Sequence, residues 1–448
     1  MPIQDSELGT AVKAVARSTS YLAFLVAIFF ALCACGQRMI DGSSVKPLAD
    51  TSQPDSRVDL EQLLPAIEVQ LEKQGSARKP PITDAELQRL AQAMPCPIPT
   101  MLEQIYRWHN GVDRLLPGYD LLSLDETLNE LRGIRQTELA VGVPASLAWP
   151  KTYLPILRFD SQEYIALDCA RKDGGALLHN MSESSDWDAR YRGLGHLLVV
   201  TLTAYESGAY RSRRWYLDEN PIELSKAYRQ HALPSELAGY EENWKLLARP
   251  LKDGDRQSFQ SALAWVPHRP DERYIPILQG RLRDEDSEVV MHAASMLGTL
   301  RAQVAQEDLV GLLTSRSDGV RNFAAHSLAC LDHLDQGTTV DALLKLLEDD
   351  SDLVRISAIE ALATARSSRA VGPLLELLPT SRPGIQQSIV STLGELRDPR
   401  ALDALRHLRL NVAAMDQDKP DRGGVRGSDP PPSRLLAGID EAIRAIGG

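Results

Sequence analysis

Apolar residues return at helical spacing and in phase through the carboxy-terminal part of the chain. The equivalent positions Val289, Val320, Val354 and Ile385 are 31, 34 and 31 residues apart. Each unit joins a Leu-rich helix, such as LLKLLEDD, to a helix rich in Ala and Leu, as close helix packing demands. Units that bury their apolar faces only against neighbours predict an all-α helical-repeat solenoid over residues 250–448.

The ends of this array carry different patterns. A lead-in helix is expected at about 256–265 and a final helix at 433–446, where polar outer faces would cap the stack. The stretch 415–433 is rich in Pro, Gly and Asp, which predicts a disordered insertion within the last hairpin.

The preceding part of the chain mixes helical and strand patterns. An amphipathic helix is expected at 58–74, and Thr83 and Thr100 each stand three residues before a Glu, which predicts two capping boxes. The helix that starts at Thr100 is expected to end at Asn110 and Gly111, with Gly111 in the left-handed conformation.

Beyond Pro150 three short apolar runs predict strands. The runs YLPILRF, EYIALDC and GALLHNM are separated by turn-forming residues, and a helix follows Gly193. We therefore expect an α+β domain at 58–249, with a small antiparallel three-stranded sheet covered by helices.

The amino terminus has the layout of a signal peptide. Residues 21–34 are almost wholly apolar, follow Lys13 and Arg17, and are too few for a bilayer span of about 20 residues. Leu32 to Cys35 resembles the lipobox of bacterial lipoproteins, which implies a signal peptide at 1–35, lipidation of Cys35 and, from the residues that follow, the outer membrane. An uncleaved inner-membrane helix anchor is the alternative. The polar stretch 36–57 predicts a flexible tether.

The net charge and the cysteine content restrict the classes of ligand that we expect this chain to bind. Lys and Arg number 49 against 61 Asp and Glu, a net charge of -12, which argues against nucleic acid as a partner. Cys96, Cys169 and Cys330 are widely spaced and form no Cys-x-x-Cys pair. We expect them to be buried structural thiols, and we expect no metal.

Two family resemblances follow from these motifs. CPIPTMLEQIYRWHNGVD, LLSLDETLNEL and the three strand runs resemble the SUKH superfamily over about residues 83–216. The repeats resemble HEAT-like repeats of the short type, whose Asp-x-Val-Arg motif is intact at 318–321 and 352–355. The first resemblance implies a protein-binding module without catalytic residues, often an immunity protein that binds a toxin.

The chain contains no nucleophile elbow, Walker loop, His-Glu-x-x-His or calcium-loop pattern. We therefore expect neither an enzyme nor a cofactor. The expected function is a membrane-anchored recognition protein of the cell envelope, facing the periplasm, that binds a toxin or an envelope protein. A scaffold lipoprotein that docks through its repeats is the alternative. Candidate partner-binding residues are Trp108 and Trp149, if exposed, and Arg321 and Arg355, if they are not paired with acids of neighbouring repeats.

Overall fold

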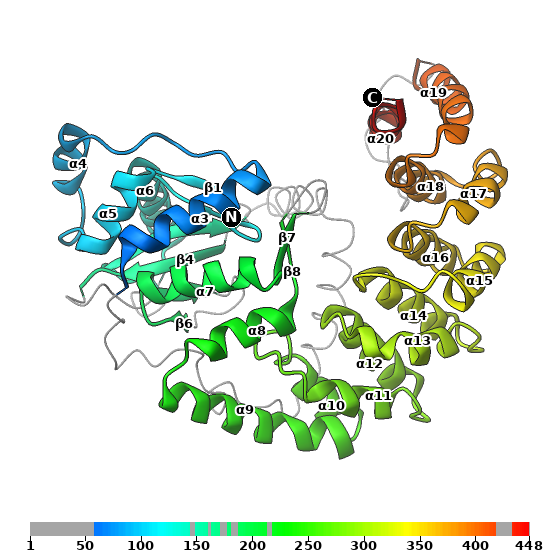
Figure 1. Ribbon diagram of the computed structural model, residues 1–448, viewed down its shortest axis with the longest axis horizontal. Coiled ribbons are helices and arrows are strands. Elements are labelled where there is room, and N and C mark those ends of the chain that lie inside the picture. Colours follow the sequence, from blue (N-terminus) through cyan, green and yellow to red (C-terminus); the bar gives the residue numbers. More distant parts are fainter. Residues whose placement is uncertain are drawn as a thin grey trace, which may run out of the picture.

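Two lobes form the described part of the molecule, and Figure 1 shows them joined at one end through α8, α9 and α10. The lobes are an α+β unit and a stack of helical hairpins, which confirms the expected fold class. The computed structural model describes residues 58–143, 148–159, 163–170, 177–180, 187–212, 217–417 and 432–447.

The sheet of the first lobe is an antiparallel meander in which six consecutive strands pair in sequence order. Three of these strands were expected, whereas β1, β2 and β6 were missed because they are short and carry charged residues among the apolar ones. The strands are β1 (Val112–Leu116), β2 (Tyr119–Leu121), β3 (Tyr153–Phe159), β4 (Glu163–Asp168), β5 (Leu177–Asn180) and β6 (Trp187–Tyr191).

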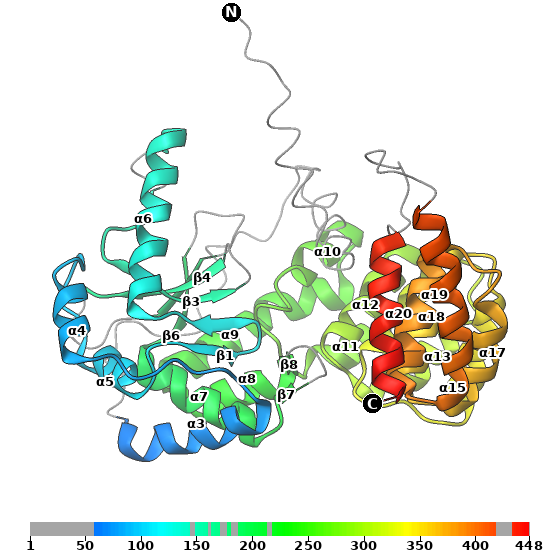
Figure 2. The ribbon, with the colours of Figure 1, turned by 90° about the horizontal axis from the view of Figure 1, so that it is seen from above.

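Helices cover this sheet. Figure 2 shows α3 and α7 on one side of it, while α6 begins beside β3 and projects away. A separate hairpin of β7 (Tyr210–Ser212) and β8 (Leu217–Glu219) follows α7. The helices are α3 (Leu60–Gln74), α4 (Asp84–Ala91), α5 (Thr100–Trp108), α6 (Leu124–Val141), α7 (Leu194–Glu206) and α8 (Pro221–Gln230).

One predicted capping box is present and the other is not. Thr83 caps α4 together with Glu86, as expected. Thr100 is instead the first residue of α5, because Pro99 holds the cap position and Glu103 bonds to Arg107 one turn later, 2.9 Å away.

The expected glycine stop of α5 is also wrong. The helix ends at Trp108, and an extended His109 follows it. Gly111 has a φ of +118°, and a Cβ there would lie 3.0 Å from the Lys79 side chain and 3.3 Å from the Ser123 amide. This glycine therefore permits a close approach of chain segments at the start of β1.

The second lobe is built of hairpins whose second helices stack on one another. Figure 1 shows α12, α14, α16, α18 and α20 as the row nearer the first lobe and the first helices of each hairpin outside it. The helices are α9 (Pro234–Asp253), α10 (Arg256–Leu263), α11 (Tyr274–Arg281), α12 (Ser287–Thr299), α13 (Gln306–Leu312), α14 (Asp318–Cys330), α15 (Thr338–Lys345), α16 (Asp352–Thr364), α17 (Val371–Leu377), α18 (Pro383–Leu396), α19 (Leu402–Gln417) and α20 (Pro432–Gly447). Short 3₁₀ turns lie at η2 (Gln303–Ala305), η3 (Leu346–Glu348), η4 (Ser368–Ala370) and η5 (Pro399–Ala401).

The expected insertion at 415–433 falls between α19 and α20. Helix α19 runs to Gln417 and α20 begins at Pro432, so helices occupy both ends of that range. Residues 418–431 lie outside the described part of the chain.

Two hydrophobic cores meet in α8 and α9. Helix α8 contributes Tyr228 to the core of the first lobe and Ile222 to that of the repeats. Helix α9 contributes Tyr240 to the first core, and Leu247 and Leu251, both fully buried, to the second. The expected domain boundary at residues 249 and 250 lies inside α9, so these two helices belong to both lobes.

Candidate protein-interaction site at the junction of the lobes

Four charged residues connect the β7–β8 hairpin to the repeats, and we call them the junction cluster: Arg211, Asp218, Arg301 and Asp332. Arg301 forms an ion pair with Asp218 of the hairpin, and its second nitrogen lies 3.0 Å from Asp332. Arg211 approaches Asp332 from the hairpin at 2.8 Å. The side chains of Arg301, Asp218 and Asp332 are only 11–12% exposed, so these pairs lie largely out of water.

The backbone at the end of α12 explains how Arg301 reaches the hairpin. Arg301 adopts a left-handed φ of 52°. Its amide donates to Gly298 O at 2.9 Å, and the Ala302 amide donates to Leu297 O at 2.9 Å. This is the Schellman arrangement, in which glycine is the usual residue at the left-handed position. Burial opposes the charge of Arg301, but Asp218 and Asp332 raise its pKa, so the guanidinium stays charged.

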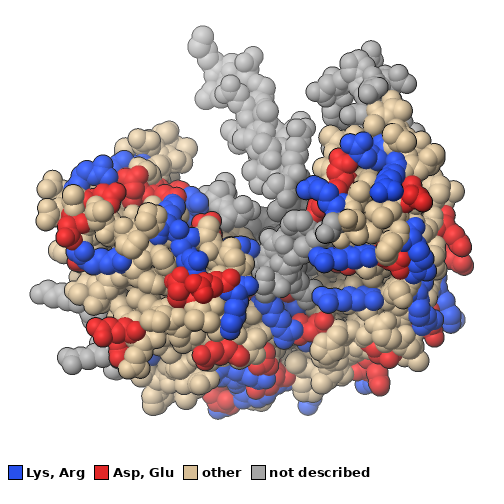
Figure 3. Space-filling model, turned by 45° about the horizontal axis from the view of Figure 1, so that its top comes forward, with Lys and Arg blue, Asp and Glu red and all other residues tan. Residues whose placement is uncertain are grey.

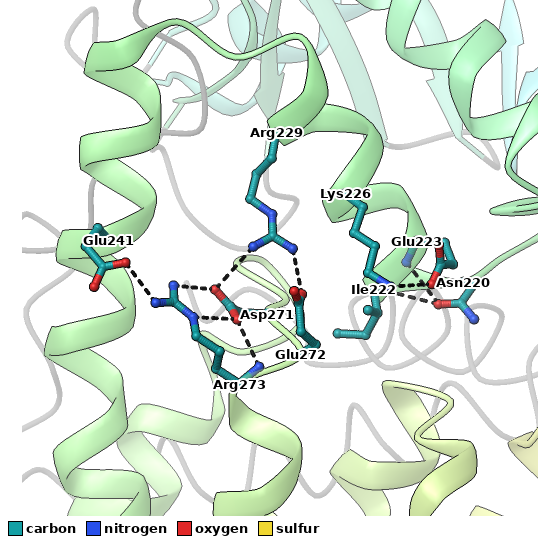
Figure 4. Close-up of polar contacts among 9 residues, drawn as sticks. All are labelled: Asn220, Ile222, Glu223, Lys226, Arg229, Glu241, Asp271, Glu272 and Arg273. Carbon is teal, nitrogen blue, oxygen red and sulfur yellow. Dashed lines mark hydrogen bonds and ion pairs between the residues drawn. The ribbon is translucent and has the colours of Figure 1, made fainter.

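A second set of ion pairs fastens α8 to the start of the repeats (Figure 4). Arg229, near the end of α8, lies 2.6 Å from Glu272 and 3.9 Å from Asp271. Arg273 binds both carboxylate oxygens of Asp271, at 2.9 and 2.7 Å, and Glu241 of α9 at 2.8 Å. The bond to Asp271 is the main cause that raises the pKa of Arg273.

The other labelled residues of Figure 4 position α8 itself. Asn220 caps this helix, because its side-chain oxygen accepts from the amides of Ile222 at 3.1 Å and Glu223 at 3.2 Å. Lys226 lies 2.8 Å from Glu223 one turn along. The cap fixes the start of α8, and the opposite end then presents Arg229 to the repeats.

A buried ion pair links the turn before α7 to α9. Arg192 and Glu236 form a charge-assisted hydrogen bond, and their side chains are 3% and 1% exposed. Arg192 also donates to His231 O at 3.0 Å, and Glu236 accepts from the Leu233 amide at 2.7 Å. These extra bonds compensate for the loss of hydration that a buried pair suffers.

His196 lies beside this pair in a neutral state. Its Nδ1 accepts from the Arg192 amide at 3.2 Å. Burial, with Arg192 and His231 nearby, lowers the pKa of His196 to about 3. The imidazole is therefore uncharged at neutral pH and belongs to the packing between α7 and α8.

The two candidate tryptophans belong to the first lobe. Trp149 is 8% exposed, and its Nε1 donates to Tyr153 O at 2.7 Å, so it fills the core as a buried tryptophan does. Trp108 is half-buried at the end of α5 and packs against the same core. Neither lies at the junction of the lobes.

The two candidate arginines make different contacts. Arg321 binds both oxygens of Asp349, at 2.7 and 2.9 Å, and thereby links its repeat to the next one. Arg355 instead pairs with Asp352 of its own helix, because the position one repeat after Asp349 is Thr380 and offers no carboxylate. Arg321 thus makes the pairing with a neighbouring repeat that was the alternative to partner binding, whereas Arg355 is paired within its own helix, and the junction cluster gave no signal in the sequence.

The cysteines were only partly understood from sequence. Cys96 and Cys169 form a disulfide, with their Cα atoms 6.0 Å apart, which corrects the expectation that both are thiols. Pairing depends on Cα atoms brought within about 4.4–6.8 Å, and a separation of 73 residues conceals that distance. Cys35 lies outside the described residues.

The third of these cysteines lies near a histidine. Cys330 Sγ is 3.8 Å from His326 Nε2, and Glu360 lies 4.0 Å from the Nδ1 of the same ring. Residues four apart on a helix share one face, so the contact of Cys330 with His326 follows from helix geometry alone.

The described residues offer neither a metal site nor a membrane-spanning helix. No group of three or more His, Cys, Asp or Glu side chains is placed there to hold a metal ion. In the same ranges no helix combines the length and the apolar character that crossing a membrane requires.

Three solved structures illustrate what part of this chain is similar to. An engineered protein is 20% identical with a TM-score of 0.33, covering 45% of this chain and 94% of that one. Computationally designed armadillo repeat proteins for modular peptide recognition are 18% identical with a TM-score of 0.33, covering 45% and 98%. The complex of CpcE and CpcF of phycocyanin lyase from Nostoc sp. PCC7120 is 16% identical with a TM-score of 0.27, covering 45% and 94%. The search of curated proteins found no match.

Family models match both lobes. Residues 245–329 and 340–414 match the model for HEAT repeats. Residues 81–194 match the model for the SMI1 / KNR4 family (SUKH-1). Both resemblances expected from the motifs are thereby confirmed: the chain carries a SUKH-1 segment followed by HEAT repeats.

Proposed function

We propose that this chain is a lipid-anchored recognition protein of the cell envelope that binds a protein partner and has no catalytic activity. The observation that carries the proposal is the junction cluster, which holds the lobe that contains the SUKH-1 segment against the HEAT repeats through ion pairs whose Arg301, Asp218 and Asp332 side chains are only 11–12% exposed. Both kinds of module offer surfaces to which proteins can bind. Rigid coupling of the lobes keeps these two surfaces at a fixed distance and orientation. A preorganised surface loses less entropy on binding than two freely jointed modules would.

The proposed location outside the cytoplasm has two supports. The lipobox-like segment at 32–35 is one, and the polar stretch 36–57, which is expected to be a flexible tether, would allow the lobes to stand away from the bilayer. The Cys96–Cys169 disulfide is the other, because disulfides persist in oxidising compartments and are rare in the cytoplasm.

The non-catalytic role is supported by how the polar side chains are used. Arg192, Arg273 and Arg301 are each engaged by carboxylates that join one element to another. Their charges therefore stabilise the arrangement of the lobes. A protein of the immunity type, which neutralises a toxin by binding it, agrees with such an architecture.

Anchoring is tested by metabolic labelling with an acyl probe, comparing the wild-type chain with Cys35→Ser. We expect label on the wild type alone, together with its recovery in the membrane fraction. Cys33→Ser is the matched control, since it removes the neighbouring thiol and should leave the label in place. Label that persists on Cys35→Ser would rule out lipidation at this residue.

Partner binding is tested by site-specific photo-crosslinking of the full chain in intact cells, with the probe placed at exposed positions of each lobe. We expect one protein to crosslink from both lobes, and a secreted toxin would support the immunity role. An envelope protein crosslinked from the repeats alone would favour the scaffold role. The absence of a crosslinked protein at every position would overturn the proposal.

A further inference from the structure

Three arginines occupy one position of the repeat and share one backbone conformation; we call them the arginine row: Arg301, Arg366 and Arg397. The equivalent position in the repeat between Arg301 and Arg366 is occupied by Asp332. The four positions are 31, 34 and 31 residues apart, and these are the steps of the repeat itself. Each ends the second helix of a hairpin in the left-handed region, with φ of 52°, 50° and 52°. The row is therefore a feature of the solenoid edge and not of one loop.

The left-handed conformation makes arginine a costly residue at these positions. Glycine adopts it without a Cβ clash, whereas other residues lose about 1 kcal/mol. The amides of Arg366 and Arg397 close their helices with bonds of 2.9 Å to Ala363 O and 3.2 Å to Leu393 O. Those bonds need only the backbone, so the side chain is what distinguishes arginine from glycine here.

Arg301 shows what a side chain in this position does. It binds Asp218 on the β7–β8 hairpin of the other lobe, with support from Asp332 of the next repeat. Asp332 occupies the position between Arg301 and Arg366. Because the β7–β8 hairpin pairs with both Arg301 and Asp332, it covers the end of the row that begins at Arg301. Asp218 of the same chain is therefore the acidic ligand of Arg301.

The other two members face solvent. Arg366 and Arg397 are exposed, and among the described residues neither makes a side-chain ion pair. Figure 3 shows Lys and Arg side chains on several sides of the repeat lobe, the side that faces the first lobe among them. An acidic ligand could therefore reach the exposed guanidinium groups of both Arg366 and Arg397.

We infer that Arg366 and Arg397 bind an acidic, extended segment of the protein partner. The inference rests on the proposed recognition function and names the chemistry of the ligand. Helices α16 and α18 pack directly on each other, and packed helix axes lie about 8–10 Å apart. A polyproline II segment advances about 9 Å in three residues and returns to the same face. Carboxylates three residues apart would therefore match the two arginines.

The test uses the full chain and a fluorescent peptide of four Glu-Pro-Pro repeats, with four Gln-Pro-Pro repeats as the uncharged counterpart. Fluorescence anisotropy at 150 mM NaCl should detect the acidic peptide only. The variant Arg366→Gly with Arg397→Gly should bind it at least fivefold more weakly. Glycine suits the left-handed backbone, so this variant should unfold at no lower temperature than the wild type.

The matched control is Arg316→Gln with Lys345→Gln, which removes two positive charges elsewhere on the repeats. Both residues are exposed and form no side-chain ion pair in the described part of the chain. The control should bind the acidic peptide as the wild type does. Equal loss in both variants would show general charge attraction and overturn the inference, and so would unchanged binding in the glycine variant.

Two further arms separate other ligands and the proposed function. If oligothymidylate or phosphatidylglycerol vesicles bind through Arg366 and Arg397 more tightly than the peptide, the row is a phosphate site and the inference is wrong. A crosslinked partner that persists in the glycine variant overturns the inference but leaves the proposed function intact. Failure to crosslink any partner overturns the proposed function itself.

Discussion

The packing of α12 against α14 can be tested at a single glycine. Gly298 lies one residue before the end of α12, and a Cβ placed there would come 2.7 Å from Ser327 Cα and 2.9 Å from Ser327 Cβ. Ser327 is fully buried, and its hydroxyl donates to Ala294 O of α12 at 2.8 Å. The change Gly298→Ala must therefore push the two helices apart or displace the serine.

The expected size follows from opposing effects. Overpacking a tight helix contact costs about 1–3 kcal/mol, and the strained Ser327 hydrogen bond adds about 1 kcal/mol. The higher helix propensity of alanine returns up to about 1 kcal/mol. We expect Gly298→Ala to lower the free energy of unfolding by about 1–3 kcal/mol, measured by urea denaturation followed by far-ultraviolet circular dichroism.

Gly311 provides the matched control. It also lies one residue before the end of its helix, α13, but a Cβ there would meet no atom within 4 Å. Gly311→Ala should therefore raise the free energy of unfolding by about 0.5–1 kcal/mol through helix propensity alone. If Gly298→Ala proves as stable as Gly311→Ala, the close contact between α12 and α14 does not exist as described.

Three further predictions concern pH, the disulfide and the junction. The pKa of His196, about 3 in the folded chain, lies below its ordinary value of 6.5. The free energy of unfolding should therefore fall by up to about 1.4 kcal/mol per unit as pH drops from 6.5 towards 3, and less steeply in His196→Gln. Reduction of Cys96–Cys169, which closes a separation of 73 residues, should cost about 4 kcal/mol in urea denaturation, and a double serine variant should not respond to dithiothreitol. Arg301→Gln leaves Asp218 largely buried without its arginine and should cost about 3 kcal/mol, with an increased radius of gyration in small-angle X-ray scattering; an unchanged radius would show that the cluster does not hold the lobes together.

Periodicity predicted the repeats well because each hairpin obeys local rules. Leu282, Leu313, Leu347 and Leu378 recur with the repeat, and all four are buried in one continuous core. A residue in such an array contacts only its own and adjacent units, so a short window of sequence contains most of the information.

The first lobe was predicted less completely because its sheet depends on pairing between short segments. Strand β2 has only three residues and is held by β1 and β3 on either side, which no local pattern reveals. The turn before it requires Gly118 at a φ of +75°, where a Cβ would lie 2.1 Å from the Phe159 ring. That contact joins residues 41 positions apart, and it becomes visible only once the sheet has formed.

The site itself was missed because its members come from both lobes. Arg211 and Asp218 sit on a hairpin that looks like any polar turn in the sequence, and Arg301 falls in the segment after a helix, where glycine would be expected. Each residue alone suggests a solvated surface charge. Their meaning depends on a tertiary contact between residues 83 positions apart.

The helices shared by the two cores decide how the lobes can respond to a partner. A hinge needs a segment that bends without exposing apolar surface, yet α8 and α9 each bury residues in both cores, from Ile222 to Leu251. Rotation of one lobe would also separate the Arg301–Asp218 pair, which is largely out of water, and breaking such a pair costs about 3 kcal/mol. That free-energy cost is larger than the stabilisation that most single surface contacts with a partner provide. A partner that touches both lobes must therefore fit the spacing already present, so the ligand adapts its conformation to the protein, as an extended acidic segment on Arg366 and Arg397 can do.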